Sequence, residues 1–476
     1  MANQMLTALR ENYKDSCDFK ERTAAAGGDG ACASLFWLDS VASTSDLSDR
    51  ILRPFTDPIR FKGVKDAAEA ARLMLAGTVY NADAKLETDA AAVISSLADG
   101  HCALVFRDTQ LALTFEVRTS ERRGVEEPKE EKVIRGAKDA FTETIRTNTA
   151  LIRRKLPSPQ LVIEEVPNAC PTGGKVRIVW QRGLTDETLV NEVRRRLALL
   201  DADAILTAAA IDRVLADRPR SLLPQTMSTE RSDKFALNIL EGRVGVIADG
   251  LPLGWLAPCP LEQFLRVPED VSQHPVLASV TTILRWAALV LALVLPAFYV
   301  AVAMYHQEML PVKLMQAIIK AKQSVPSPTA VETLTMLVSI DLLQEAGLRL
   351  PNPIGETISI IGALLVGQAA IDAKIVSPVV VIVVSLATIA GYTSPNQELG
   401  ATLRIFRILL VLAAVAAGMM GVASALTLMV YYLCTLEVCG KPYTHPFSSG
   451  SFRAALTALT CRASAAAHPS NRTKEK

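Results

Sequence analysis

Long apolar stretches in the last third of the chain predict helices that cross a membrane. The segment from Trp286 to Tyr305 is uncharged over 20 residues, which matches the roughly 20 residues that a helix needs to span a bilayer. Uncharged stretches at 375–397 and 408–436 predict two further spans. The second of these has 29 residues and is long enough to be tilted or broken. Shorter apolar helices are expected at 329–346 and 354–371.

The two shorter helices carry carboxylates, which are costly in hydrocarbon and should face a bundle interior, a water-filled cavity or the membrane surface. At about 100° per residue, each helix gathers polar and small residues on one face. This pattern is typical of a polar conduit for ions or small solutes, and tight helix packing is the alternative. The candidate pore-lining or polar intramembrane residues are Glu332, Thr335 and Ser339 on the first helix and Glu356, Ser359, Ala363 and Gly367 on the second.

In the last span, small residues repeat along one face, and Gly418 and Gly421 are predicted to allow close helix packing. Two arginines, Arg404 and Arg407, precede this span, and a basic tail follows it. By the positive-inside rule, the tail is expected in the cytoplasm.

Before residue 275 the pattern changes to short apolar strands separated by amphipathic helices, and it occurs twice. The segment HCALVF at 101–106 turns and returns as LALTFEV, and RVGVIAD at 243–249 turns at Asp249-Gly250 and returns as LPLGWLAP. Asp-Gly is a strong hairpin signal. The predicted fold class is an α/β soluble N-terminal region of two related subdomains, followed by an α-helical transmembrane bundle.

The expected domain boundaries follow these changes of pattern. They are a flexible N-terminus at 1–30, subdomain 1 at 31–121, a charged helical connector at 122–170, subdomain 2 at 171–275, the transmembrane helices at 281–440 and a cytoplasmic tail at 441–476.

Charge is distributed unevenly, although the net charge of the whole chain is only +1. From Thr281 onward there are 14 Lys+Arg and 9 Asp+Glu, whereas the preceding part has 36 and 40. Neither part has the strongly basic face that nucleic acid requires. The N-terminus has no apolar segment behind a basic start, so we expect the soluble region to stay in the cytoplasm.

Residues for catalysis are absent from the sequence pattern. The five histidines have no metal-ligand spacing, and the paired glycines lack the remaining residues of a phosphate loop. We therefore expect no enzyme activity, no cofactor and no metal. In the charged connector, Arg146, Arg153 and Arg154 are candidates for binding phosphate or an acidic partner surface, although such a run is commonly the solvated face of a helix.

Three stretches are similar to defining segments of the GerA family of spore germination proteins: RGVEEPKEEKVIRGAKDAFTETIRTNTALIRRK at 123–155, PQTMSTERSDKFALNILEGRVGVIADG at 224–250 and PNPIGETISIIGALLVGQAAIDAKIVSPVVVIVV at 351–384. They occur in the family's order, and the resemblance extends from about Ser34 to Pro446.

This resemblance implies the A subunit of a nutrient germinant receptor, a multi-pass protein of the spore inner membrane. It implies a permease-like B subunit and a lipoprotein C subunit as partners, a homo-oligomer in the lipid bilayer, and coupling of nutrient sensing to ion release. Two alternatives are a SpoVAF-like accessory of the efflux machinery and a non-conducting membrane scaffold.

Overall fold

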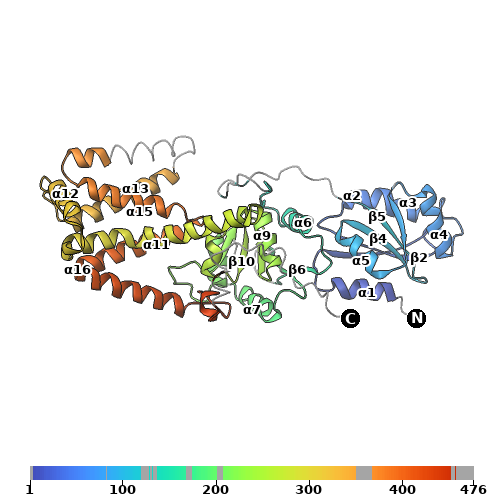
Figure 1. The fold of residues 1–476 in the computed structure, drawn as a ribbon. Helices are drawn as coiled ribbons and strands as arrows, with labels where there is room; N and C mark the ends of the chain where they lie inside the picture. Colours follow the sequence, from blue (N-terminus) through green and yellow to red (C-terminus); the bar gives the residue numbers. More distant parts are fainter. Residues whose placement is uncertain are drawn as a thin grey trace. The chain divides into compact units, whose positions relative to one another are not determined.

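The computed structural model describes residues 4–81, 83–118, 128, 131, 137–167, 174–200, 207–349, 367–451 and 456 (Figure 1). The chain divides into two compact units. The first, Met1–Pro219 with Gln225–Pro258, contains two β-sheets, and we call it the sheet unit. The second, Arg220–Pro224 with Cys259–Lys476, is mainly helical, and we call it the helical unit.

The first sheet has the strand order β1-β2-β4-β5-β3, and all of its pairs are antiparallel. Apolar residues on both faces of the central strands explain why helices cover both sides. On one face Phe36 and Val105 pack against α1 and α5, and on the other Leu35 and Leu104 pack against α3 and α4. The elements are α1 Gln4–Tyr13, β1 Phe19–Ala25, β2 Cys32–Leu38, α2 Thr44–Asp46, η1 Leu47–Leu52, α3 Arg53–Thr56, α4 Ala67–Leu73, η2 Met74–Thr78, β3 Ala84–Glu87, α5 Ala90–Ala98, β4 His101–Phe106 and β5 Ala112–Glu116.

The second sheet has the order β6-β7-β9-β10-β8, which repeats the order of the first. The predicted pair of related α/β subdomains is therefore confirmed, while the exact domain boundaries stay predictions. The Asp249-Gly250 turn joins β9 to β10, and Gly250 has the positive φ of 84° that such turns require. The elements are α6 Ile145–Lys155, β6 Leu161–Glu165, β7 Val176–Gln181, α7 Glu187–Leu197, α8 Ala208–Leu215, β8 Met227–Thr229, α9 Ser232–Leu240, β9 Val244–Ala248 and β10 Gly254–Ala257.

In the helical unit, α11, α13, α15 and α16 lie side by side (Figure 1). Their shared core includes Ala297, Val384 and Leu410. The elements are η3 Leu261–Leu265, α10 Glu269–Ser272, α11 Pro275–Tyr305, η4 Gln307–Met309, α12 Val312–Lys322, α13 Thr329–Arg349, α15 Pro378–Gly391, α16 Gln397–Thr435, β11 Glu437–Val438, β12 Lys441–Pro442 and η5 Phe447–Ser449.

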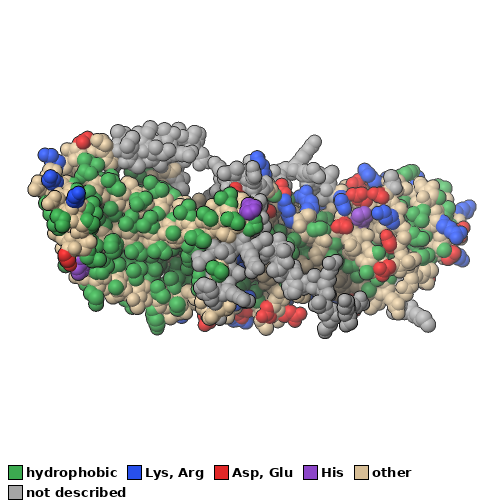
Figure 2. Space-filling model, in the orientation of Figure 1, with side chains coloured by type: hydrophobic (Ala, Val, Ile, Leu, Met, Phe, Trp, Pro, Cys, Tyr) green, Lys and Arg blue, Asp and Glu red, His purple; other side chains and the backbone are tan. Residues whose placement is uncertain are grey.

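Two described helices, α11 and α16, are long and apolar enough to cross a membrane, and α15 is a shorter apolar helix. Only 44% of the most apolar 18-residue segment of α11, and 39% of the corresponding segment of α16, are buried within the chain. Figure 2 shows hydrophobic side chains covering most of the helical bundle on the face drawn, whereas charged side chains gather over the sheet unit. Because so much apolar surface faces outward, we interpret the bundle as a set of helices whose outer surface contacts lipid.

The helix α16 is not continuous. Ala417 (φ −142°, ψ 20°) and Gly418 (φ 58°, ψ −136°) leave the helical region and divide it into two halves. At one end of α16, Thr402 Oγ1 donates a hydrogen bond to the Leu222 carbonyl (2.6 Å), and at the other the Tyr432 hydroxyl lies 2.8 Å from Ser221 Oγ. Both ends of α16 thus return to the segment 220–224, so α16 is a helical hairpin.

Candidate functional site

The carboxylate of Glu332 is buried between α13 and α15, with 1% of the residue exposed. Its Oε2 accepts a hydrogen bond from the backbone N–H of Ser377 at 2.8 Å. Ser377 is the N-cap of α15, so the carboxylate lies at the helix end whose unpaired N–H groups favour a negative charge. Glu332 therefore holds the start of α15 against the start of α13.

Lys322, in the last turn of α12, places a cation close to this carboxylate. Lys322 Nζ lies 3.9 Å from Glu332 Oε1 and donates a hydrogen bond to Thr329 Oγ1. Tyr299 of α11 also interacts with Glu332 and Ser377. The sequence pattern identified Glu332 as a candidate but not these partners, which come from three other segments.

The other candidate residues of this region have different surroundings. Thr335 is exposed and Ser339 is half-buried, so within one chain they do not share the buried environment of Glu332. Gly367 is buried, and a Cβ placed there would lie 3.6 Å from Val381 of α15, which indicates helix packing. Their role in a pore stays a prediction. Glu356, Ser359 and Ala363 lie outside the described residues.

A second buried charge pair joins α13 to α16, and sequence reasoning missed it. Arg407 Nη2 donates a hydrogen bond to Asp341 Oδ1 at 2.9 Å. We expected Arg407 before the span, but it lies within α16 and is only 4% exposed. An arginine directly before the 29-residue apolar run, together with an aspartate in the apolar helix expected at 329–346, is the signal that could have revealed this pair.

Breaking the pair should destabilise the bundle. We expect Arg407→Gln to lower the free energy of unfolding by about 2 kcal/mol, because it leaves Asp341 without its cation. The expected loss of stability is smaller than for a fully buried pair, because the Asp341 side chain is 19% exposed. Thermal unfolding of the detergent-solubilised protein measures the change. Adding Asp341→Asn should restore part of the loss, and a double variant no more stable than Arg407→Gln would contradict the pairing.

The predicted packing glycines lie at the turn of the α16 hairpin. The Tyr305 hydroxyl donates a hydrogen bond to the Val415 carbonyl at 2.6 Å, which satisfies a backbone group near the break in the helix. A Cβ on Gly418 would lie 3.0 Å from the Tyr305 ring. A Cβ on Gly421 would lie 2.0 Å from the Ala413 carbonyl oxygen. The Tyr305 side chain therefore packs against the break in the helix.

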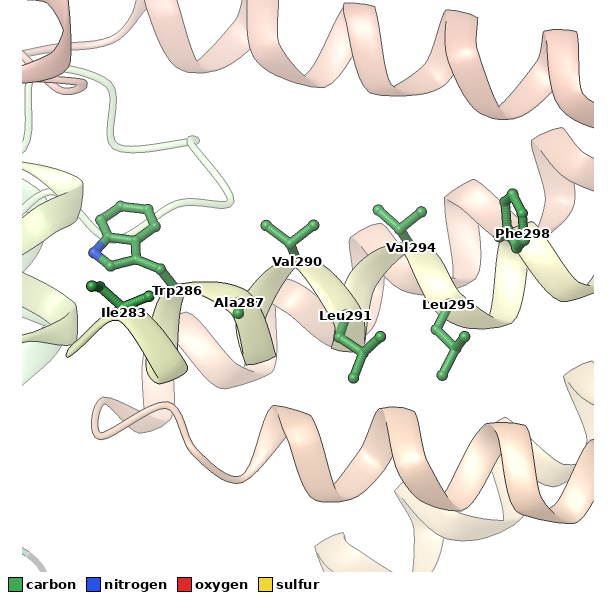
Figure 3. Close-up of a pocket in the computed structure, with 8 residues that line it drawn as sticks. All are labelled: Ile283, Trp286, Ala287, Val290, Leu291, Val294, Leu295 and Phe298. Carbon is green, nitrogen blue, oxygen red and sulfur yellow. The ribbon is translucent and has the colours of Figure 1, made fainter. Parts of the chain in front are cut away.

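An apolar groove of about 620 Å³ follows one face of α11 (Figure 3). Its lining residues recur every three or four positions, as a single helix stripe does. The groove lacks the convergent polar groups of a small-molecule site, so we interpret it as a surface for acyl chains or a neighbouring helix. The lining residues are Ile283, Trp286, Ala287, Val290, Leu291, Val294, Leu295 and Phe298.

In the sheet unit, the three candidate arginines of α6 have different environments. Arg153 is buried, and its Nε and Nη2 contact Asp18 Oδ2 and Oδ1 at 2.8 and 2.9 Å. Arg146 is half-exposed and contacts Asp39, and Arg154 is exposed. Only Arg146 and Arg154 are therefore accessible to a partner, and Arg153 instead joins the two subdomains.

Within the described ranges, no group of three or more His, Cys, Asp or Glu side chains is placed to hold a metal ion.

Comparison with known proteins gives consistent matches. The family model described as Bacillus/Clostridium GerA spore germination protein matches residues 7–473. The Uncharacterized membrane protein YfkQ of Bacillus subtilis is 33% identical over 87% of this chain and 80% of its own length. Spore germination protein KA of the same organism is 36% identical over 75% of this chain and 66% of its own length.

A solved structure also matches. It is the crystal structure of the N-terminal domain of the A subunit of the Bacillus megaterium spore germinant receptor GerK3. The match has 25% sequence identity and a TM-score of 0.42, and it covers 53% of this chain and 92% of that chain.

Proposed function

The chain belongs to the GerA family of spore germination proteins, and from this premise we propose that it is the A subunit of a nutrient germinant receptor in the spore inner membrane. The observation that carries the proposal is the family match over residues 7–473, which includes both the sheet unit and the helical unit. In this role the chain works with a permease-like B subunit and a lipoprotein C subunit, and it couples nutrient sensing to ion release.

The α16 hairpin supports a multi-pass arrangement. Its two halves have about 20 and 17 residues, which at roughly 1.5 Å per residue is close to the thickness of a bilayer core. Both ends contact the segment 220–224, which belongs to the helical unit although the residues before and after it in sequence belong to the sheet unit. The C-terminal tail and the N-terminal region then share one side, and the basic tail favours the cytoplasmic side.

An oligomer with a central conduit would use the outward faces of the bundle. The exposed Thr335 and the half-buried Ser339 on α13 support a contact outside the single chain, because the protomer itself leaves them uncovered. In the oligomer they line the conduit together with the stripe at Glu356, Ser359 and Ala363. Around the conduit, the apolar groove of α11 faces acyl chains.

Deleting the gene in its endospore-forming host tests this function. Spores without the protein should lose rapid cation release in response to one nutrient from a panel of amino acids, sugars and nucleosides, and a copy of the gene should restore it. The response to the other nutrients is the internal control. Equal slowing after every trigger would indicate an accessory of the efflux machinery instead, and unchanged release after all of them would contradict both roles.

A further inference from the structure

Glu332 keeps one carboxylate oxygen without a hydrogen-bond partner among the described residues. Oε2 is used by the Ser377 backbone N–H, whereas the buried Oε1 accepts no hydrogen bond. The side chain is 0% exposed, so bulk solvent does not solvate this oxygen. Buried polar atoms nearly always have a partner, and an exception indicates a water molecule or an ion.

Lys322 does not donate a hydrogen bond to this oxygen. Its Nζ lies 3.9 Å from Glu332 Oε1, beyond the 2.7–3.2 Å of a normal N–H···O bond. It donates instead to Thr329 Oγ1, which is itself buried. An ammonium group is similar in size and charge to a potassium ion. The chain therefore already places a tethered monovalent cation beside the carboxylate.

We propose that Glu332 Oε1 and Thr329 Oγ1 form a binding site for a monovalent metal ion, K⁺ or Na⁺, in which the ion competes with the Lys322 ammonium. This inference deepens the proposed function and rests on it for its biological role. Carboxylate and hydroxyl oxygens suit hard cations. One carboxylate balances a single positive charge, and no cluster of three acidic, histidine or cysteine side chains for a divalent ion occurs in the described ranges.

The competition has a structural consequence for α12. None of the side chains of this 11-residue helix is fully buried, and Lys322 in its last turn is one of its points of attachment to the bundle. An ion that displaces the ammonium releases this attachment. Ion occupancy at Glu332 is thereby linked to the position of the connection between α11 and α13.

The test uses the purified full-length chain in detergent and follows its unfolding temperature while KCl or NaCl replaces N-methylglucamine chloride at constant ionic strength. Lys322→Met removes the tethered competitor, so its unfolding temperature should rise with K⁺ or Na⁺, with a midpoint at least tenfold lower in ion concentration than for the unchanged chain. Lys320→Met, an exposed lysine of the same helix, should behave like the unchanged chain. Glu332→Gln should remove the ion dependence.

If Glu332→Gln fails to fold, the comparison of Lys322→Met with Lys320→Met still decides, because both keep the carboxylate. Equal unfolding temperatures of Lys322→Met in all three salts would overturn the site and leave a water molecule as the partner of Oε1. The measurement needs no nutrient, spore or partner subunit. Its failure therefore leaves the receptor role standing, and a failed deletion experiment leaves the ion site standing.

Discussion

Replacing Arg153 with methionine should lower the free energy of unfolding of the sheet unit by about 4 kcal/mol. The guanidinium contacts both carboxylate oxygens of Asp18, and its Nη1 donates to the Leu161 carbonyl at 3.1 Å. The side chains of the pair are 1% and 2% exposed. Removing one member leaves the other charge buried without compensation, which typically costs 3–5 kcal/mol. Urea or thermal unfolding followed by circular dichroism measures the loss.

The neighbouring Arg154 is the matched control, because it lies on the same helix and is exposed. Arg154→Met should change the unfolding free energy by less than about 0.5 kcal/mol. Adding Asp18→Asn to Arg153→Met should recover part of the loss, since no charge then remains buried. Equal stability of the two single arginine variants would refute the role of the pair.

The pH dependence of stability provides an independent check on Asp18. Burial acts to raise the pKa of this carboxyl, but the charge of Arg153 and hydrogen bonds from Arg153 and Ser40 outweigh it, so the pKa is lowered. A carboxyl with a lowered folded-state pKa stabilises the protein above its unfolded-state pKa of about 3.9, and the contribution disappears as pH falls through the folded value. This acid-side loss should be smaller in Asp18→Asn.

The sequence predicted what depends on local pattern. Alternating apolar residues and the Asp249-Gly250 turn identified two copies of an α/β subdomain, because strand period and turn chemistry are local properties. The start of a helix at Thr329 was also visible. In contrast, Arg153 and Asp18 are 135 residues apart, and Arg407 and Asp341 are 66 apart. Single-sequence periodicity has no information about which distant charges will meet.

The helix break in α16 shows a second limit. Proline is the expected helix breaker, yet Pro296 lies inside the continuous helix α11, whereas α16 breaks at Ala417 and Gly418. The small residues in this region predict a packing face between helices. They have that role within a single hairpin, where Gly421 contacts the backbone of Ala413. Small residues indicate close approach but do not specify which segment approaches.

Replacing Gly421 with alanine should therefore prevent the α16 hairpin from closing. The added Cβ would lie 2.0 Å from the Ala413 carbonyl oxygen and 2.8 Å from its carbon, and backbone atoms cannot move aside as a flexible side chain does. We expect a loss of more than about 4 kcal/mol, which belongs to the severe end of single substitutions. The amount of protein in the membrane fraction and its unfolding temperature in detergent measure the effect.

Gly400→Ala is the matched control on the same helix, because no atom lies within 4 Å of the Cβ position. Alanine favours helix over glycine by up to about 1 kcal/mol, so this variant should be neutral or slightly more stable. Normal accumulation of Gly421→Ala would mean that the two halves of α16 do not meet. A single straight helix of 39 residues would then be roughly 58 Å long, nearly twice the hydrocarbon thickness of about 30 Å. The hairpin resolves this mismatch, because each half alone is close to the bilayer thickness.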